Sequence, residues 1–481
     1  MKPIFLAFVT SILWAHSIWA ADDCPVVEHQ PRQVRAPLSE LPAYAAYKSR
    51  LRNEAFGTRL DYHQLVFTPA ELVESVGNGA FESTMTSKMP IFFIGIEKIR
   101  RQASRHVPRN TCKARDLDGA RLHRSFQQTG SNTTAKKGVD AACQVLDDKR
   151  PLLLTHIAKS DGLIDGHYQK PCLLYSVYPG RQYCPDAFSD SGALNTPYDY
   201  NSAVEAVSGL QLAMDKAVEE QRPTHLLILS TGWNTQQDES LYNYIDWLSA
   251  IDRAATPGQF RPLVVAFTWQ SGFDWLPRFL GVVTKGNDAD EIGLTWANRV
   301  VNDAVMPVAS KSGIPVVMVG HSYGTRVLGT AIFDRAVIDR SFDILGSGKV
   351  PVTFIALQPA IPIQRFSSAG KEPLYSHWKS VPILNVFTAS KHDKANSMLD
   401  RYWGTYLGGE KALKIAGRFD GTSVLSLSES GEFLEPPKVG RLNLVNASSV
   451  VRCAMPGTGG AAHSDVFDDQ IGRLIWSAIS R

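Results

Sequence analysis

The chain has 481 residues, of which 44% are apolar and 20% are charged, a composition typical of a globular protein. Lys and Arg number 50 against 47 Asp and Glu, so the formal net charge is only +3. This balance excludes a general nucleic-acid binder that works through a broad basic surface. After the N-terminus, no stretch reaches the roughly 18–20 consecutive apolar residues that a membrane-spanning helix needs.

The first 20 residues have the pattern of a secretory signal peptide. Lys2 supplies a positive end, the run from Ile4 to Trp14 is apolar, and Ser17-Ile-Trp-Ala20 is a plausible cleavage site. His16 interrupts the apolar run and polar residues follow at once, which favours cleavage over an uncleaved anchor. We therefore expect a secreted or periplasmic protein.

Residues 21–195 form an N-terminal region with no motif that points to a chemistry. Five of the six cysteines lie there and the sixth, Cys453, lies near the C-terminus. Because five cannot pair among themselves, full oxidation requires one bridge between this region and the C-terminal part. Cys172 and Cys184 flank the turn signal Pro179-Gly180 and are candidates to close a hairpin. The other pairings stay open, and zinc is a weaker interpretation because no CxxC spacing is present.

From Ala203 onward, helical and strand-like patterns alternate. Apolar residues at helical spacing predict helices at 203–220, 291–308 and 325–340. Short apolar runs predict strands at 226–229, 263–267, 316–319, 352–356, 383–387 and 442–445, and two earlier runs, 92–94 and 152–154, are also typical of core strands. Such alternation indicates an α/β fold, with a mostly parallel doubly wound sheet and helices on both faces. Ligands of such sheets lie beyond the carboxyl ends of the strands.

The strand expected at 316–319 runs into Gly320-His321-Ser322-Tyr323-Gly324, which is G-x-S-x-G between a strand and a helix. In this setting a tight turn lifts the serine above the sheet, over the positive end of the helix. Ser322 is therefore the candidate nucleophile. The alternative interpretation is a Gly-rich turn that contains a serine by chance. The strand before this turn and the helix after it favour the nucleophile over that alternative.

A nucleophilic serine needs a base and an orienting acid, which in this arrangement follow it in the order acid, then His. Asp393 follows the strand expected at 383–387 and is the candidate acid. His463 lies on a glycine-rich loop before a last helix expected at 467–479, and it is the candidate base. A solvated helix cap is the alternative role for His463, and His392 is a rival base that suits the surface better.

An oxyanion hole needs two backbone N–H groups aimed at the developing negative charge. We expect those of Tyr323 and Trp233, because Trp233 follows Gly232 in the loop after the strand at 226–229. An ordinary Gly-Trp-Asn turn is the alternative interpretation of that loop.

Five segments appear in order along residues 200–481: Gly232-Trp233-Asn234, Phe267-Thr-Trp269-Gln-Ser271, the turn Gly320–Gly324 (the nucleophile elbow) with Arg326-Val327-Leu328, Ser390-Lys-His-Asp393-Lys-Ala395 and His463-Ser-Asp-Val-Phe467. In these segments the chain resembles a little-characterised bacterial branch of the α/β-hydrolases. The resemblance implies a catalytic domain at 196–481, with the cysteine-containing region 21–195 as an extension. Two departures stand out: Thr231 replaces the usual His before Gly232, and Ala360 replaces a common Asp. Either could alter the rate or the substrate.

The candidate triad, the resemblance and the signal-like N-terminus together predict an exported serine hydrolase that cleaves a carboxylic ester through a Ser-His-Asp triad, without a metal or an organic cofactor. Gly232, Trp269, Phe273 and Trp275 are expected to bind a small-molecule or lipid ester, although the aromatic residues of 273–279 could equally be helix core. A lipase, thioesterase or peptidase on the same triad remains open, as does an inactive binding module at the cell envelope. No nucleic-acid partner is expected.

Three acidic residues precede the helix expected at 291–308. Asp288, Asp290 and Glu291 are expected to form a solvated helix start and not a metal site.

Overall fold

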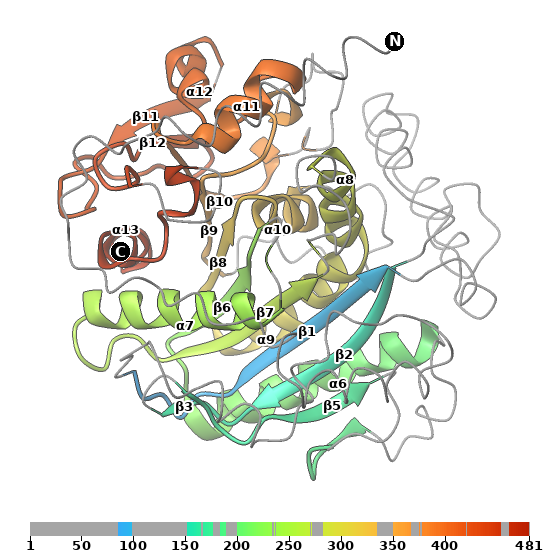
Figure 1. Ribbon diagram of the computed structural model, residues 1–481. Helices are drawn as coiled ribbons and strands as arrows, with labels where there is room; N and C mark the ends of the chain where they lie inside the picture. The colour runs from blue at the N-terminus through green and yellow to red at the C-terminus, as the bar shows by residue number, and fades with distance from the viewer. Residues whose placement is uncertain are drawn as a thin grey trace, which may run out of the picture.

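Figure 1 shows the computed structural model of the chain. The structure describes residues 85–98, 152–164, 167–176, 183–188, 200–232, 235, 237–269, 271, 282–333, 350–366, 375, 378–419, 421–453 and 461–480. The expected signal peptide, Trp233, Phe273 and Trp275 lie outside these residues, so what the sequence predicts for them stays a prediction.

The strands are β1 (Ile91–Lys98), β2 (Leu152–Ser160), β3 (Leu163–Ile164), β4 (His167–Tyr168), β5 (Cys172–Ser176), β6 (His225–Ser230), β7 (Pro262–Trp269), β8 (Val316–His321), β9 (Val352–Leu357), β10 (Ile383–Ala389), β11 (Thr422–Ser426) and β12 (Leu442–Asn446). The α-helices are α6 (Tyr200–Gln221), α7 (Gln237–Ala254), α8 (Val282–Ile292), α9 (Met306–Ser312), α10 (Gly324–Phe333), α11 (Lys394–Trp403), α12 (Glu410–Ile415) and α13 (Asp469–Ile479). Shorter turns of π- and 3₁₀-helix are η8 (Gly293–Ala297), η9 (Val300–Val305), η10 (Ile363–Phe366), η11 (Trp378–Ser380), η12 (Ala416–Arg418) and η13 (Ala462–Ser464).

Ten of the described strands form one sheet, in the order β11-β12-β10-β9-β8-β6-β7-β1-β2-β5. The pairs from β11 through β1 are all parallel, whereas β2 is antiparallel to both β1 and β5. The predicted α/β architecture with a mostly parallel sheet is therefore confirmed. The carboxyl ends of β6, β8, β9 and β10 meet at one edge of this sheet.

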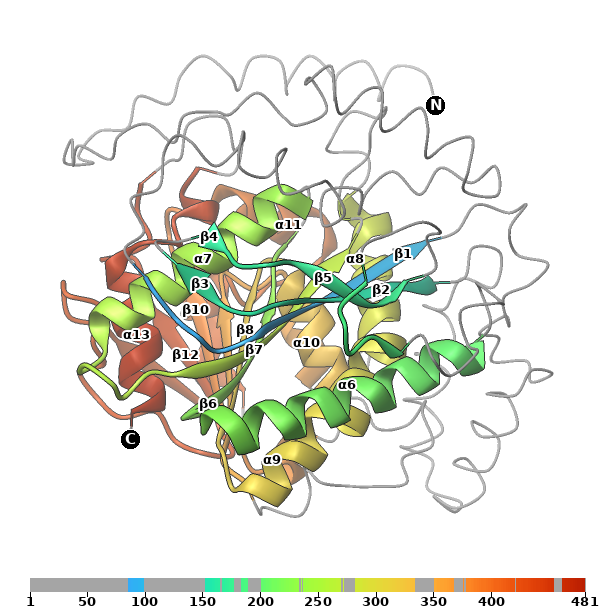
Figure 2. The same cartoon turned by 90° about the horizontal axis from the view of Figure 1, so that it is seen from below.

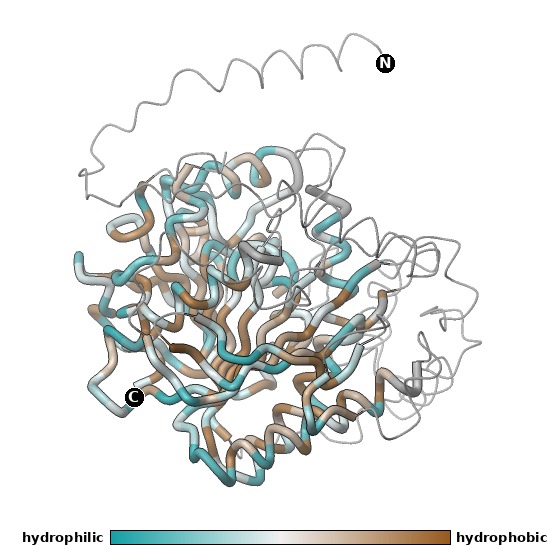
Figure 3. The backbone as a smooth tube through the Cα atoms, turned by 60° about the horizontal axis from the view of Figure 1, so that its bottom comes forward, coloured by the Kyte–Doolittle hydropathy of each residue, from teal (hydrophilic) through white to brown (hydrophobic). Residues whose placement is uncertain are grey.

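The sheet is buried on both faces, which is why its central strands are nearly continuous apolar runs. One face packs against α6, α9, α10 and the π-helical turns, and the other packs against α7 and α13. Figure 2 shows these two layers on either side of the strands, and Figure 3 shows the apolar residues concentrated on the strands at the centre. The residues of β6, β7 and β8 are all buried, so the elements that carry the site are rigidly held.

Part of the region before residue 196 belongs to the same sheet. The apolar runs at 92–94 and 152–154 lie in β1 and β2, and β1 pairs in parallel with β7. Three strands from this region therefore extend the sheet that carries the predicted catalytic residues, so the expected boundary at residue 195 does not separate two sheets.

A disulfide joins Cys172 and Cys184, as the flanking pattern suggested. The hairpin expected between them is not found among the described residues, because the bridge between Leu173 and Tyr183 is parallel. Cys453 is also disulfide-bonded, to a partner outside the described residues. Cys24, Cys112 and Cys143 lie outside them too, so their pairing stays a prediction.

Several elements differ from the sequence prediction, and no predicted helix covers α7, α11 or α12. The helix expected to start at Glu291 begins with α8 at Val282 and continues through two π-helical turns to α9. Strand β11 was not predicted, because its alternately exposed residues, including the half-exposed Val424, form no apolar run. No helix in the described part of the chain is both long and apolar enough to span a bilayer.

Candidate active site

Ser322 lies at the turn between β8 and α10, in a backbone conformation that is rare for residues with a side chain. Its φ is +53°, in the left-handed region. The turn is held by its neighbours: the Ser322 N–H donates to the Leu357 carbonyl at 3.1 Å, and the Ser322 carbonyl accepts from the Thr325 and Ala360 N–H groups at 3.2 and 3.3 Å. A strained backbone conformation of this kind persists only where neighbouring contacts hold it in place, and it is typical of functional sites.

The structure brings Ser322, His463 and Asp393 together in one chain of hydrogen bonds. His463 Nε2 lies 2.9 Å from Ser322 Oγ, and His463 Nδ1 lies 2.8 Å from Asp393 Oδ2. The three residues are separated in sequence by 141 and 70 positions, but each follows an element that ends at the same edge of the sheet. In the neutral imidazole with its proton on Nδ1, that N–H donates to Asp393 and Nε2 is the nitrogen that can accept from the serine hydroxyl.

His463 lies on η13, and several contacts hold this turn in place. His321 Nε2 bonds the His463 carbonyl at 2.9 Å, and the two rings lie 4.9 Å apart. Trp247 Nε1 donates to the Val466 carbonyl at 2.7 Å, and Asp465 Oδ2 accepts the Cys453 N–H at 2.7 Å. The loop that carries the imidazole is therefore tied to α7, to β8 and to the segment after β12.

Asp393 is fully buried and caps the N-terminus of α11. Its Oδ1 accepts the Asn396 N–H at 2.8 Å, and its Oδ2 accepts Asn396 Nδ2 at 2.8 Å. These bonds fix the orientation of the carboxylate toward the imidazole. Asn396 did not emerge from the sequence as part of the site, although its position three residues after a capping Asp is a recognisable helix-start spacing.

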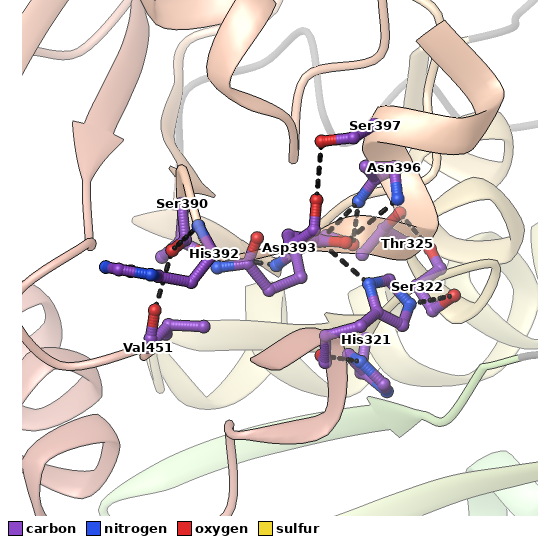
Figure 4. Close-up of polar contacts among 12 residues, drawn as sticks. His321, Ser322, Thr325, Ser390, His392, Asp393, Asn396, Ser397 and Val451 are labelled. Carbon is purple, nitrogen blue, oxygen red and sulfur yellow. Dashed lines mark hydrogen bonds and ion pairs between the residues drawn. The ribbon is translucent and has the colours of Figure 1, made fainter. Parts of the chain in front are cut away.

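His392 does not share this arrangement. Figure 4 shows its side chain pointing away from Ser322, and the residue is only partly buried. Partial burial and the charges of Lys391 and Lys394 lower its pKa. The geometry thus separates the two neighbouring residues: Asp393 points into the site and His392 points out of it.

On the other side of Ser322, the end of β6 approaches the elbow closely. A Cβ on Gly232 would lie 2.4 Å from Ser322 Cβ and 2.9 Å from the His321 carbonyl oxygen, so only glycine fits there. Tyr323 is buried, with the Arg326 guanidinium 5.3 Å from its ring centre, and burial raises the pKa of its phenol. Trp269 is 2% exposed, and its indole N–H bonds the Thr231 carbonyl at 3.3 Å.

Asp288, Asp290 and Glu291 are buried, so the prediction of a solvated helix start is wrong. Asp290 bonds the guanidinium groups of Arg326 and Arg365, the latter at 2.6 Å through both nitrogens. Burial raises the pKa of Asp290, but the two arginines outweigh it and lower that pKa to about 2. The carboxylate therefore joins α8, α10 and η10 beneath the elbow by tertiary pairing that no local pattern reveals.

Within the described residues, no group of His, Cys, Asp or Glu side chains has the geometry to hold a metal ion. The site brings together a serine hydroxyl, an imidazole hydrogen-bonded to it, and a buried carboxylate on the other ring nitrogen, with Gly232 next to the serine.

No protein-family model matches the chain, and no curated protein matches it. Among solved structures, the phospholipase PlaB from Legionella pneumophila, in complex with thio-NAD, is similar at 16% sequence identity and a TM-score of 0.24. The similarity covers 45% of this chain and 49% of the phospholipase, so the chain spans about half of that protein's length. Similarity this low carries no argument about function, which must come from the geometry of the site.

Proposed function

We propose that this chain is an exported serine hydrolase of the α/β-hydrolase fold that cleaves carboxylic esters. The observation that supports it most strongly is the hydrogen-bonded series Ser322, His463 and Asp393 at an elbow whose serine has a φ of +53°. A serine after the central strand β8, between β6 and β9, is the position at which a nucleophile elbow belongs. Residues 196–481 would form the catalytic domain.

In this proposal Ser322 Oγ attacks the ester carbonyl while His463 Nε2 takes its proton. Asp393 holds the neutral imidazole in the tautomer that accepts at Nε2, and it stabilises the imidazolium that then forms. His463 returns the proton to the leaving alcohol, so an acyl-enzyme remains on Ser322. Water deprotonated by His463 then releases the acid and restores the serine. The backbone N–H groups of Tyr323 and Trp233 would stabilise the oxyanion in both steps.

Export is supported by the signal-like N-terminus and by the disulfide between Cys172 and Cys184, since disulfides persist in oxidising compartments. The substrate would be a small-molecule or lipid ester contacted by Gly232, Phe273 and Trp275, whereas the buried Trp269 would support the loop at Thr231. Hydrolysis rates for a series of esters with increasing acyl-chain length would show which chain length the protein prefers.

The test is reaction with a fluorophosphonate probe together with hydrolysis of a short p-nitrophenyl ester. We expect labelling at Ser322, and loss of hydrolysis in Ser322→Ala and His463→Ala. His392→Ala is the matched control, because this histidine adjoins Asp393 but points away, and it should keep wild-type activity. A folded protein that neither labels at Ser322 nor hydrolyses any ester of the series would overturn the proposal and favour an inactive binding module.

A further inference from the structure

The backbone at the end of β6 lies in close contact with the elbow, residues 320–324, at two points. Besides the contact at Gly232, a Cβ on Gly324 would lie 2.1 Å from the Ser230 carbonyl oxygen. The backbone that follows β6 therefore has no room to move toward α10. What keeps it from moving away is a separate set of contacts, made by α7 and by the end of β7.

Thr231 is held through its N–H, its hydroxyl and its carbonyl. Its N–H donates to Tyr244 Oη at 3.2 Å, and its Oγ1 lies 2.8 Å from Ser240 Oγ. Trp269 Nε1 donates to the Thr231 carbonyl. Tyr244 in turn donates its O–H to the Phe267 carbonyl at 2.5 Å, so one fully buried phenol on α7 joins the ends of β6 and β7.

Ser271 holds the other end of the same loop. The Thr235 N–H donates to Ser271 Oγ at 2.9 Å, and the Ser271 O–H donates to the Thr235 carbonyl at 2.8 Å. Ser271 is 1% exposed and Thr235 is 6% exposed, so these bonds are shielded from water. The Ser271 hydroxyl thus hydrogen-bonds both the N–H and the carbonyl of Thr235, and it fixes the position of Thr235 at the end of the loop.

We propose that Tyr244 and Ser271 are positioning residues for the oxyanion hole, and this inference rests on the proposed function. They fix Thr231 and Thr235, which precede and follow Gly232 in the chain, and so hold Gly232 against Ser322. Preorganised N–H groups stabilise an oxyanion because no reorganisation is needed during the reaction, and this requires a loop that cannot drift. The Phe-x-Trp-x-Ser segment, residues 267–271, would serve this positioning, since Phe267 and Trp269 each contribute one of these hydrogen bonds and Ser271 contributes two.

The experiment compares Tyr244→Phe and Ser271→Ala with the wild type. On a p-nitrophenyl ester we expect kcat to fall by about 10- to 100-fold, because small misplacements of catalytic groups are this costly. KM should stay within about twofold, because ground-state binding does not depend on the oxyanion contacts. The inhibition constant of a trifluoromethyl ketone, which forms a tetrahedral oxyanion on serine, should rise by the same factor as kcat falls.

Two matched controls remove similar buried hydroxyl bonds elsewhere. Tyr168→Phe loses a phenol that donates to the Leu241 carbonyl of α7 at 2.7 Å without touching the loop. Ser160→Ala loses a hydroxyl that donates to the Gly162 carbonyl at 2.9 Å and accepts its N–H at 3.3 Å, at the opposite edge of the sheet. Both should keep wild-type kcat and inhibition.

Two results would overturn the inference while leaving the proposed function intact. One is that Tyr244→Phe and Ser271→Ala match their controls in kcat and inhibition. The other is a lowered melting temperature and a lower kcat with unchanged ketone inhibition, which would make the two residues merely structural. A wild-type protein that neither labels nor hydrolyses esters would instead refute the proposed function, and this inference would fall with it.

Discussion

Gly232→Ala tests how closely the loop after β6 must approach the nucleophile. The added Cβ would lie 2.4 Å from Ser322 Cβ, 2.9 Å from the His321 carbonyl oxygen and 3.1 Å from Ser322 Oγ. Ordinary van der Waals contact begins near 3.4 Å, so the loop and Ser322 would have to separate by about 1 Å. The two nearest atoms, Ser322 Cβ and the His321 carbonyl oxygen, cannot move by a side-chain rotation, so the backbone itself must move.

A displacement of this size near the reacting atoms costs about 100-fold in rate, or about 2.7 kcal/mol of transition-state stabilisation. The same overpacking should lower the free energy of unfolding by about 1–3 kcal/mol. The assay is kcat and KM on a p-nitrophenyl ester, with the melting temperature measured in parallel. We expect the loss in kcat, because the binding of the intact ester needs no contact at the oxyanion.

Gly417→Ala is the matched control, since a Cβ there would meet no atom within 4 Å. It should leave kcat and the melting temperature unchanged. A Gly232→Ala variant whose kcat stayed within about threefold of the control would show that the close approach of Gly232 to Ser322 does not matter for the reaction.

Three further predictions concern the acid, the buried ion pairs and the disulfide. Asp393→Asn should lower kcat by about 10⁴-fold with little change in melting temperature, because the amide favours the wrong tautomer of His463; rates within tenfold of wild type would contradict this. Asp290→Asn should lower the free energy of unfolding at pH 7 by about 3–5 kcal/mol in urea titrations, since it leaves two buried guanidinium groups without their carboxylate. The folded-state pKa of Asp290 is depressed to about 2 from 3.8, so its contribution is present above pH 4 and is lost as the pH falls toward 2; the difference between variant and wild type should shrink over that range. Replacing both Cys172 and Cys184 by Ala should cost about 2–3 kcal/mol by thermal unfolding, because the bridge closes a short loop of separation 12, and an unchanged melting temperature would refute that estimate.

Much of the framework could be predicted from the sequence, because strands buried on both faces must be apolar along their whole length. Six apolar runs from 226 to 445 lie in β6, β7, β8, β9, β10 and β12, each within a few residues of the predicted bounds. The sequence also placed Ser322, Asp393 and His463 after elements that end at the sheet's carboxyl edge. Once the strands are parallel, residues at their ends converge, and separations of 70 and 141 positions become hydrogen bonds.

The partners of the buried polar groups could not be predicted from the sequence, because they lie far away in the chain and come together only in the tertiary structure. Asp290 looked like a solvated helix start, yet its partners Arg326 and Arg365 lie 36 and 75 residues later, and only folding brings them together. The Thr231 carbonyl likewise accepts from Trp269, 38 residues later at the end of β7. A local pattern reports which side of an element is apolar; whether a buried charge or backbone group finds its counterpart depends on how the elements pack.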